Sequence, residues 1–154
     1  MSCEGCHRNG PPLAAEFWVR ESRDITACDL LKLMQACGCA TTGRALDAER
    51  LEQAIENFSY VSQVLNSAGE LMGYLSAVSD AASLVYIVHL MVHPAWRRRG
   101  IGSLLMNQLE ARYRGVPVQL DASTSAVPFF EQRGYGCRPA THAMGKRPGL
   151  KAIP

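Results

Sequence analysis

Hydrophobic and polar positions follow a two-residue period in some segments of the chain and a helical period in others. The run EFWVRE at residues 16–21 alternates between the two kinds of residue and predicts a first strand. Further strands are expected over residues 60–65, 71–78 and 84–92, and the turn formers between them predict an antiparallel meander. The run LVYIVHLMV at 84–92 is almost wholly apolar, so we expect a central strand that is covered on both faces.

The helical spacing of apolar residues predicts the remaining elements. A first helix is expected between Thr26, which forms a capping-box-like start with Asp29, and Gly38. The later elements are expected to be a helix over 48–57 capped by Asp47, a helix over 103–114, a strand over 116–120, a short helix over 126–133 and a strand from Tyr135. Because the helix over 103–114 connects two strands as a crossover, we expect those strands to run parallel.

These elements predict an α/β fold of mixed α+β content. We expect a central mixed sheet, mostly antiparallel, with one parallel strand-helix-strand crossover and helices on both faces. At 154 residues the chain fits one domain, expected over residues 16–145, between a flexible N-terminal segment at 1–15 and a loose basic tail at 146–154. Cys28, Cys37 and Cys137 are expected to fill the core as small apolar side chains.

The composition narrows the class of protein. The chain is 47% hydrophobic and 19% charged, and no apolar run approaches the roughly 20 residues of a membrane span, so we expect a globular protein without a membrane partner. A net charge of +2 is too small to indicate nucleic-acid binding. The N-terminal segment lacks the apolar stretch of a secretory signal, so we expect a cytoplasmic protein whose six cysteines are reduced.

The segment at residues 97–102, Arg-Arg-Arg-Gly-Ile-Gly, stands between an apolar strand and a helix and has the features of a phosphate-binding turn. Glycines let the backbone approach a ligand closely, and a helix that begins there directs unpaired N–H groups at an anion. The string is not a P-loop, because Gly-Lys-Ser/Thr does not follow a glycine at the required spacing. It is not a dinucleotide fingerprint either, because Leu105 occupies the place of the third glycine.

Two longer segments resemble the motifs of one family. VHLMVHPAWRRRGIGSLLMNQL resembles the acetyl-CoA motif of the GNAT superfamily of N-acetyltransferases, which has a strand, a short loop with proline and then Q/R-x-x-G-x-G/A at the start of a helix. ASTSAVPFFEQRGYG resembles the helix motif that follows it, AVPFYxxxGF. The resemblance extends from about Phe17 to Met144. It implies a GNAT-like fold, acetyl-CoA as co-substrate, and a small-molecule or peptide amine as acceptor, in a monomer or homodimer.

The resemblance also implies which residues bind CoA. Backbone groups of Leu90, Met91 and Val92 are expected to bind the pantetheine arm in the way of an added strand. The amides of residues 98–103 are expected to bind the pyrophosphate, and Arg97 matches the leading Q/R of the motif. The full set of candidates is Leu90, Met91, Val92, Arg97, Arg98, Arg99, Gly100, Ile101, Gly102, Ser103, Ser123 and Phe130.

Acetyl transfer to an amine requires a base for the amine and an acid for the leaving thiolate. Phe130 stands where the family carries its thiol-protonating tyrosine, so this acid is missing. The candidates for the base are Tyr86, which we expect on the same face as Leu90 and Val92, and His89, which also reads as a satisfied buried histidine. Asp121 is a third candidate, or alternatively a cap of the helix that follows it.

The N-terminal string Cys3-Glu-Gly-Cys6-His7 offers thiolate and imidazole groups. It matches the C-x-x-C-H string of c-type haem attachment, which we do not expect because that attachment accompanies export. A zinc site with Cys37 or Cys39 as the fourth ligand is chemically possible. We expect an unliganded N-terminal segment and no metal.

The leading hypothesis is therefore an N-acetyltransferase that transfers an acetyl group to a primary amine by direct attack in a ternary complex. An acyl-CoA-binding sensor with little turnover is the alternative, because Phe130 lacks a hydroxyl. A metal-binding interaction module led by the N-terminal cysteines is a third. The string GYLSAVSDAASLVYIVHLMVHP also resembles the branch with plant and cyanobacterial serotonin-type acetyltransferases, although Val88-His89 stands where that branch shows Trp-Asp.

Overall fold

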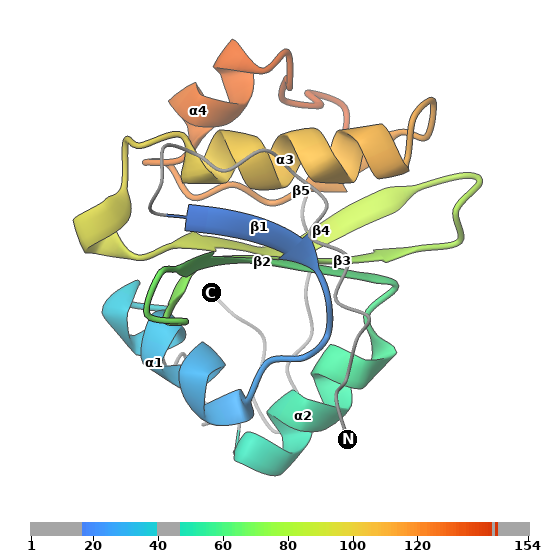
Figure 1. Cartoon of the computed structure of the whole chain (residues 1–154). Coiled ribbons are helices and arrows are strands. Elements are labelled where there is room, and N and C mark those ends of the chain that lie inside the picture. The colour runs from blue at the N-terminus through green and yellow to red at the C-terminus, as the bar shows by residue number, and fades with distance from the viewer. Residues whose placement is uncertain (1–16, 40–46, 143, 145–154) are drawn as a thin grey trace. The chain divides into compact units, whose positions relative to one another are not determined.

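The computed structural model describes residues 17–39, 47–142 and 144, and the chain divides into two compact units at residues 1–119 and 120–154. The first unit is built on a five-stranded sheet in which the strands follow one another in chain order (Figure 1). The strands are β1 (Phe17–Glu21), β2 (Tyr60–Asn66), β3 (Leu71–Ser79), β4 (Val85–Val92) and β5 (Val118–Leu120). Strands β1 to β4 pair antiparallel, which confirms the predicted meander.

Strand β5 joins the sheet next to β4, after the crossover helix α3 (Ile101–Arg112). The two strands begin side by side, because the Val85 N–H donates a hydrogen bond of 2.8 Å to the carbonyl of Pro117. Strands that begin together run in the same direction, so the sheet is mixed and the predicted fold class is confirmed. Strand β5 is shorter than predicted, since Val116 is engaged in a turn with Tyr113 and Pro117 has no N–H to donate.

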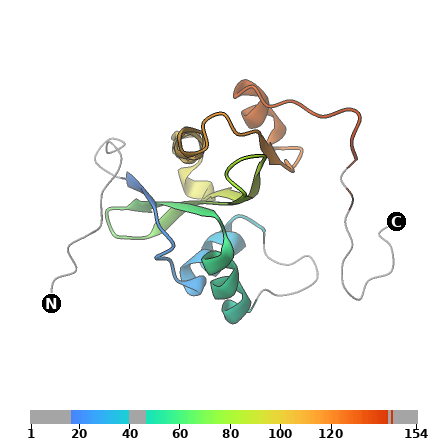
Figure 2. The ribbon, with the colours of Figure 1, turned by 90° about the vertical axis from the view of Figure 1, so that its right-hand side faces the viewer.

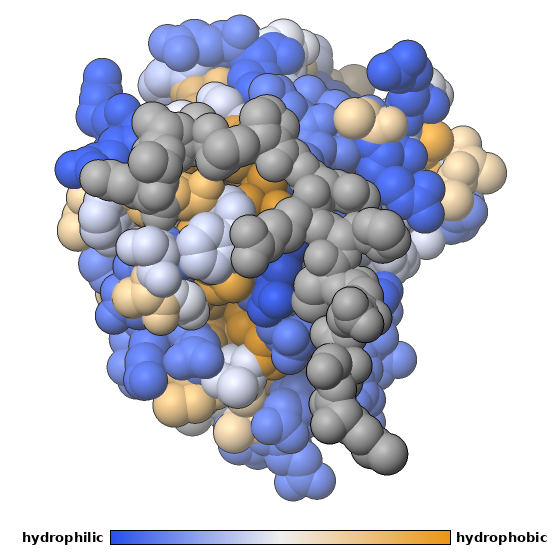
Figure 3. All heavy atoms as spheres, viewed as in Figure 1, coloured by the Kyte–Doolittle hydropathy of each residue, from blue (hydrophilic) through white to orange (hydrophobic). Residues whose placement is uncertain are grey.

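Helices cover both faces of the sheet (Figures 1 and 2). Helices α1 (Ala27–Ala36) and α2 (Ala48–Asn57) lie on one face, and α3 lies on the other. The core on the α1 face combines apolar side chains of both helices with those of the sheet: Ala27, Leu30, Leu33, Met34, Leu51, Ile55, Val61, Leu65, Leu71, Tyr74 and Met91. In the view of Figure 3, hydrophilic residues form most of the outer surface and hydrophobic residues show between them.

Both helices on this face begin at the predicted caps. The Thr26 hydroxyl accepts the Asp29 N–H at 3.0 Å and donates to the Asp29 carboxylate at 2.7 Å. The Asp47 carboxylate accepts the Arg50 N–H at 2.8 Å. Each cap satisfies an amide that the helix itself leaves without a partner, so the start of each helix is fixed by local sequence.

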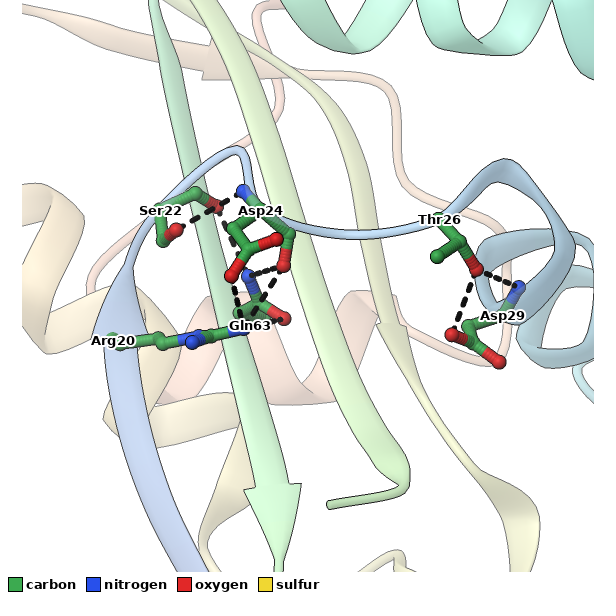
Figure 4. A network of polar contacts seen from close by, with 6 residues as sticks. All are labelled: Arg20, Ser22, Asp24, Thr26, Asp29 and Gln63. Carbon is green, nitrogen blue, oxygen red and sulfur yellow. Dashed lines mark hydrogen bonds and ion pairs between the residues drawn. The ribbon is translucent and has the colours of Figure 1, made fainter. Parts of the chain in front are cut away.

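A polar network around the buried Gln63 side chain holds the connection from β1 to α1 (Figure 4). The Gln63 side chain is buried in β2 and donates hydrogen bonds to the carbonyls of Ser22 and Asp24, at 3.2 and 3.0 Å. Arg20 donates to the Asp24 carbonyl at 2.9 Å and lies 3.6 Å from its carboxylate. These contacts satisfy the backbone of the connection and thereby set where α1 enters the core.

One irregularity in β4 changes which side chains share a face. His89 pairs with Ser76 and Ile87 pairs with Ala77, so Val88 is an extra residue without a partner in β3. Such a bulge reverses the alternation of side chains beyond it. The predicted placement of Tyr86 on the same face as Leu90 and Val92 is therefore wrong: Tyr86, His89 and Met91 share the α1 face, and Leu90 and Val92 face α3.

The second unit contains the predicted short helix α4 (Val127–Gln132). The strand predicted from Tyr135 is wrong for the described residues up to 142, which contain no strand. The Tyr135 N–H returns to the Phe130 carbonyl at 3.0 Å, Pro139 has no N–H, and Arg138 and Thr141 close a turn at 3.2 Å. These turns prevent the extended pairing that the apolar and polar pattern suggested.

The predicted burial is wrong for Cys28 and Cys137, which are exposed. Cys37 is half-buried and packs against the core on the α1 face. Cys28 follows the first residue of α1 and points away from the stripe formed by Ala27 and Leu30, so the helical period leaves it in solvent. Among the described residues, no helix is long and apolar enough to cross a membrane.

Gly73 of β3 lies directly under α3 and gives the first test of this packing. A Cβ at this position would lie 2.7 Å from Cγ2 of Ile101 and 3.2 Å from Cδ1 of Leu105. We expect Gly73→Ala to lower the free energy of unfolding by about 1–3 kcal/mol, because the helix and strand must move apart. Gly136→Ala is the matched control, since a Cβ there meets nothing within 4 Å. Equal stability of the two variants in urea unfolding would contradict this packing.

Candidate active site

The arginine-glycine segment forms a tight turn with left-handed backbone between β4 and α3. A short 3₁₀ helix, η1 (Pro94–Trp96), precedes it, and Arg98 and Gly100 have φ angles of 61° and 82°. Gly100 is the N-cap of α3 and makes no side-chain cap hydrogen bond. A Cβ on Gly100 would meet nothing within 4 Å, so the turn borders open space. The first amides of α3 thus have no side-chain cap.

Two of the three arginines of this turn are held by groups of their own unit. The Arg97 Nε donates a hydrogen bond of 3.1 Å to the Val92 carbonyl. The Arg99 guanidinium lies 4.6 Å from the ring centroid of Trp96, whose edge packs on Phe17 with centroids 5.0 Å apart. Arg98 is exposed. Amide donors with three guanidinium groups are the donor set that suits a pyrophosphate.

The end of β4 presents backbone groups beside this turn. The His93 N–H donates to the Met72 carbonyl at 2.8 Å, and backbone groups alternate in direction along a strand, so Leu90 and Val92 direct theirs away from β3. Strand β4 has eight residues and β5 has three, so residues 90–92 run past the end of β5. Met91 lies differently: it directs its backbone groups towards β3 and its side chain is buried.

His89 lies on the α1 face in a polar contact with β3. Its Nδ1 and the hydroxyl of Ser76, a fully buried residue, share a hydrogen bond of 2.8 Å. The imidazole also packs edge-on against Phe58, with ring centroids 5.9 Å apart. Burial lowers the pKa of His89, so the imidazole is neutral near pH 7 and Nε2 is the nitrogen that can take up or release a proton.

Tyr86 lies on the same face, opposite Val78 of β3. Val78 and the bulge residue Val88 are 41% and 39% exposed, which is unusual for valines within a sheet. Tyr86 itself is half-buried. The structure therefore groups Tyr86 and His89 with partly exposed apolar side chains and separates them from the Leu90 and Val92 side chains.

The remaining predicted residues lie in the second unit. The Ser123 carbonyl accepts the N–H groups of Ala126 and Val127, at 2.9 and 3.2 Å, and so begins α4. Asp121 is exposed and does not cap this helix, because the N-cap is Ala126. Phe130 is 7% exposed and packs against the rings of Phe129 and Tyr135, with centroids 5.1 and 5.6 Å away.

A hollow of about 450 Å³ opens next to η1. It is lined by Asp29, Lys32, Leu33, Ala68, Gly69, Glu70, Leu71, Met72, His93 and Trp96. Both signs of charge are present, and the Asp29 carboxylate lies 3.5 Å from the Lys32 ammonium. The lining of the hollow therefore does not strongly favour a ligand of either charge.

Two contacts of the site were not anticipated from the sequence. Ser76 could have been found, because a serine on the buried face of an apolar strand needs a partner there. Cys37 donates a hydrogen bond of 3.4 Å to the Val92 carbonyl across 55 residues of sequence, and no local signal indicates that contact.

Among the described residues, no group of three or more His, Cys, Asp or Glu side chains is placed to hold a metal ion. Cys3, Cys6 and His7 lie outside the described residues.

The comparison with protein families agrees with this arrangement. Residues 30–154 match a family model described as an acetyltransferase (GNAT) domain. The chain therefore belongs to the GNAT family of acetyltransferases. It is an N-acetyltransferase by class, and the enzymes of this family use acetyl-CoA.

Solved structures show the same fold. A Deinococcus radiodurans R1 protein assigned as an acetyltransferase matches with a TM-score of 0.70 and 23% identity, over 93% of this chain and 99% of that one. A GNAT-family acetyltransferase from Streptococcus pneumoniae TIGR4 matches with a TM-score of 0.69 and 24% identity, over 86% and 98%. Glucosamine-6-phosphate N-acetyltransferase from Arabidopsis thaliana matches with a TM-score of 0.59 and 17% identity, over 85% and 97%. No curated protein matches the chain.

The shifted titration of His89 makes the stability of the fold depend on pH. The ordinary pKa of 6.5 applies in the unfolded chain and a lower one in the fold, so the unfolded chain takes up this proton first as the pH falls. The contribution of neutral His89 to the free energy of unfolding is present above pH 6.5, and it is lost as the pH falls towards the pKa of His89 in the folded state. In thermal unfolding between pH 7.5 and 5, we expect His89→Gln to show a shallower fall of Tm than the parent protein. Exposed His142→Gln is the control, and equal slopes for the His89 variant and the parent would contradict the assignment.

Proposed function

We propose that this chain transfers the acetyl group of acetyl-CoA to a primary amine by direct attack of the amine in a ternary complex. The observation that carries the proposal is the left-handed turn at Arg98 and Gly100, which opens α3 without a side-chain cap next to the end of β4. The resemblance of this segment to the acetyl-CoA motif of the GNAT superfamily implies that the turn binds the CoA pyrophosphate. The proposal fits the donor set, since one exposed turn carries backbone amides and three arginines.

CoA binding is assigned to the turn and the end of β4. The amides of residues 98–103 take the pyrophosphate, with the Arg98 and Arg99 side chains beside them. The Val92 carbonyl already accepts Arg97 and Cys37, so the Val92 N–H and the backbone groups of Leu90 are left to pair with the amide-rich pantetheine arm. Ser123 and Phe130 belong to the second motif and remain part of the proposed CoA set.

His89 is proposed as the base that takes the proton from the attacking amine. The imidazole is neutral because of burial, and the Ser76 hydroxyl fixes its orientation. A neutral imidazole accepts a proton near pH 7. The imidazolium that results then releases this proton to water. Tyr86 is the alternative on the same face, and Asp121 is a further candidate in the second unit. Acetyl-CoA supplies the activated thioester and leaves as CoA, and the role of the chain is to hold the co-substrate and to receive the proton of the amine.

The acceptor is proposed to be a small-molecule or peptide amine. One structural neighbour acts on an amino sugar phosphate, which supports an amine without identifying it. The resemblance to the serotonin-type branch rests on residues around β3 and β4 and stays a proposal. A reducing, cytoplasmic location is supported by the free thiols of Cys28, Cys37, Cys39 and Cys137, and a monomer or homodimer without nucleic acid or membrane as partner is expected.

The experiment that tests the function measures binding and turnover separately. Calorimetry gives the Kd of acetyl-CoA, and CoA release is then followed with polyamines, arylalkylamines, amino acids and peptide N-termini. We expect binding together with CoA release for at least one amine class. Binding without release would favour the acyl-CoA sensor, and absence of binding would contradict both functions.

Arg98→Gly separates the binding role of the turn from its folding role. Glycine adopts the φ of 61° without the roughly 1 kcal/mol cost of a side chain, so the free energy of unfolding should stay equal or rise. The guanidinium is lost, so the Kd of CoA should rise about fivefold or more. Exposed Arg114→Ala, beyond the end of α3, removes the same charge and should leave the Kd unchanged. A Kd of Arg98→Gly equal to that of the parent would remove this side chain from the site.

Phe130→Tyr tests the missing acid. If departure of the thiol limits turnover, a hydroxyl at this position should raise kcat about tenfold or more, since positioned acids contribute about 10²–10⁴-fold. The KM of acetyl-CoA should change little. Phe129→Tyr adds the same hydroxyl to the neighbouring ring and is the control. An unchanged kcat would show that protonation of the leaving thiol is not the limiting step.

A further inference from the structure

The C-terminal end of α1 and the end of β4 meet at one carbonyl group. The Cys37 thiol donates to the Val92 carbonyl oxygen at 3.4 Å, and the Arg97 Nε donates to the same oxygen at 3.1 Å. The thiol also interacts with the Arg97 guanidinium. Three groups from α1, β4 and the arginine-glycine turn are therefore joined at a single point.

This arrangement uses the whole accepting capacity of the carbonyl. A carbonyl oxygen has two lone pairs, and the two donors occupy both. The guanidinium is planar, so a bond at Nε together with the adjacent thiol restricts its rotation. Arg97 is the first residue of the turn, and its position sets the direction in which residues 98–103 leave β4. Cys37 thus contacts both ends of the segment that leads from the strand to the turn.

The protonation state of Cys37 agrees with a donor role. Desolvation by burial raises the pKa of the thiol, which keeps it protonated near pH 7. A protonated thiol can donate to the Val92 carbonyl, whereas a thiolate would repel that oxygen. The half-buried position also gives the thiol a fixed environment, in contrast to Cys28, which is exposed on the same helix.

We propose that Cys37 is a positioning residue of the CoA-binding turn, which it holds through the Val92 carbonyl and the Arg97 guanidinium. The inference rests on the proposed function, because it assigns the turn to the CoA pyrophosphate. Cys37 does not touch CoA. It presets the turn so that less ordering is required when CoA binds.

The test compares variants that keep or remove the donor. Cys37→Ala and Cys37→Val both remove it, and the valine keeps the volume of the side chain. For both, we expect the Kd of CoA in calorimetry to rise about three- to tenfold, the equivalent of one hydrogen bond. Cys37→Ser retains a donor and should stay within about twofold of the parent protein. Cys28→Ala on the same helix is the control and should bind CoA unchanged.

A merely structural role gives a different result. In that case Cys37→Ala and Cys37→Val would lower Tm while their folded fraction bound CoA as tightly as the parent. In an Arg97→Ala background the positioning role predicts that Cys37→Val has little further effect on Kd, because the two side chains act through one carbonyl. Equal Kd values for Cys37→Val, Cys37→Ser and the parent would overturn the inference. Failure of the parent protein to bind CoA would instead overturn the proposed function.

Discussion

Strand β4 is the element on which the rest of the structure depends, because one of its sides is paired from end to end apart from the bulge at Val88, and the other side is paired only in part. Strand β3 satisfies that side from Val85 to Val92, whereas β5 accompanies only the first part of the other side. Backbone groups that no strand satisfies need other partners. At Val92 the partners are side chains of Arg97 and Cys37, and further back the edge is left for a ligand that is itself rich in amides. The proposed geometry of CoA recognition thus rests on a hydrogen-bonding requirement of the sheet.

The bulge at Val88 separates two roles within this single strand. Beyond it, the Leu90 and Val92 side chains pack towards α3, and their backbone groups lie at the edge. His89 and Tyr86 instead face α1, where burial keeps the imidazole neutral and Ser76 orients it. The extra residue therefore puts the proposed CoA-binding edge and the proposed base, a neutral imidazole, on one strand with their side chains on opposite faces. The three arginines of the turn also differ in their contacts. Arg97 is held by the Val92 carbonyl and Arg99 by the Trp96 ring, whereas Arg98 has the left-handed backbone.

How far the sequence predicts this arrangement depends on the range of the interaction concerned. The caps at Thr26 and Asp47, the meander and the glycine that opens α3 are local, and their residue types were sufficient. The position of the bulge is not predictable, because LVYIVHLMV is almost wholly apolar and no alternation shows where the register shifts. The contact between Cys37 and Val92 joins the end of a helix to a strand 55 residues away, and no periodic pattern in the sequence indicates it. The strand expected from Tyr135 failed for the opposite reason: a plausible local pattern was overruled by turns around Phe130 and Pro139.

Phe130 makes positioning of the reactants more important than protonation of the leaving thiol in the proposed reaction. Its ring is buried against Phe129 and Tyr135, so the position that the family motif gives to a tyrosine acid is filled here by a side chain without a hydroxyl. A thiol has a pKa near 8.5, so a thiolate leaves far more readily than an alkoxide would, and an acid is less necessary for it. Positioning of two reactants can supply several kcal/mol of the barrier without any proton transfer. An enzyme that lacks the acid therefore depends more heavily on how firmly its turn and strand edge are preset, which is the role that we propose for the two hydrogen bonds to the Val92 carbonyl.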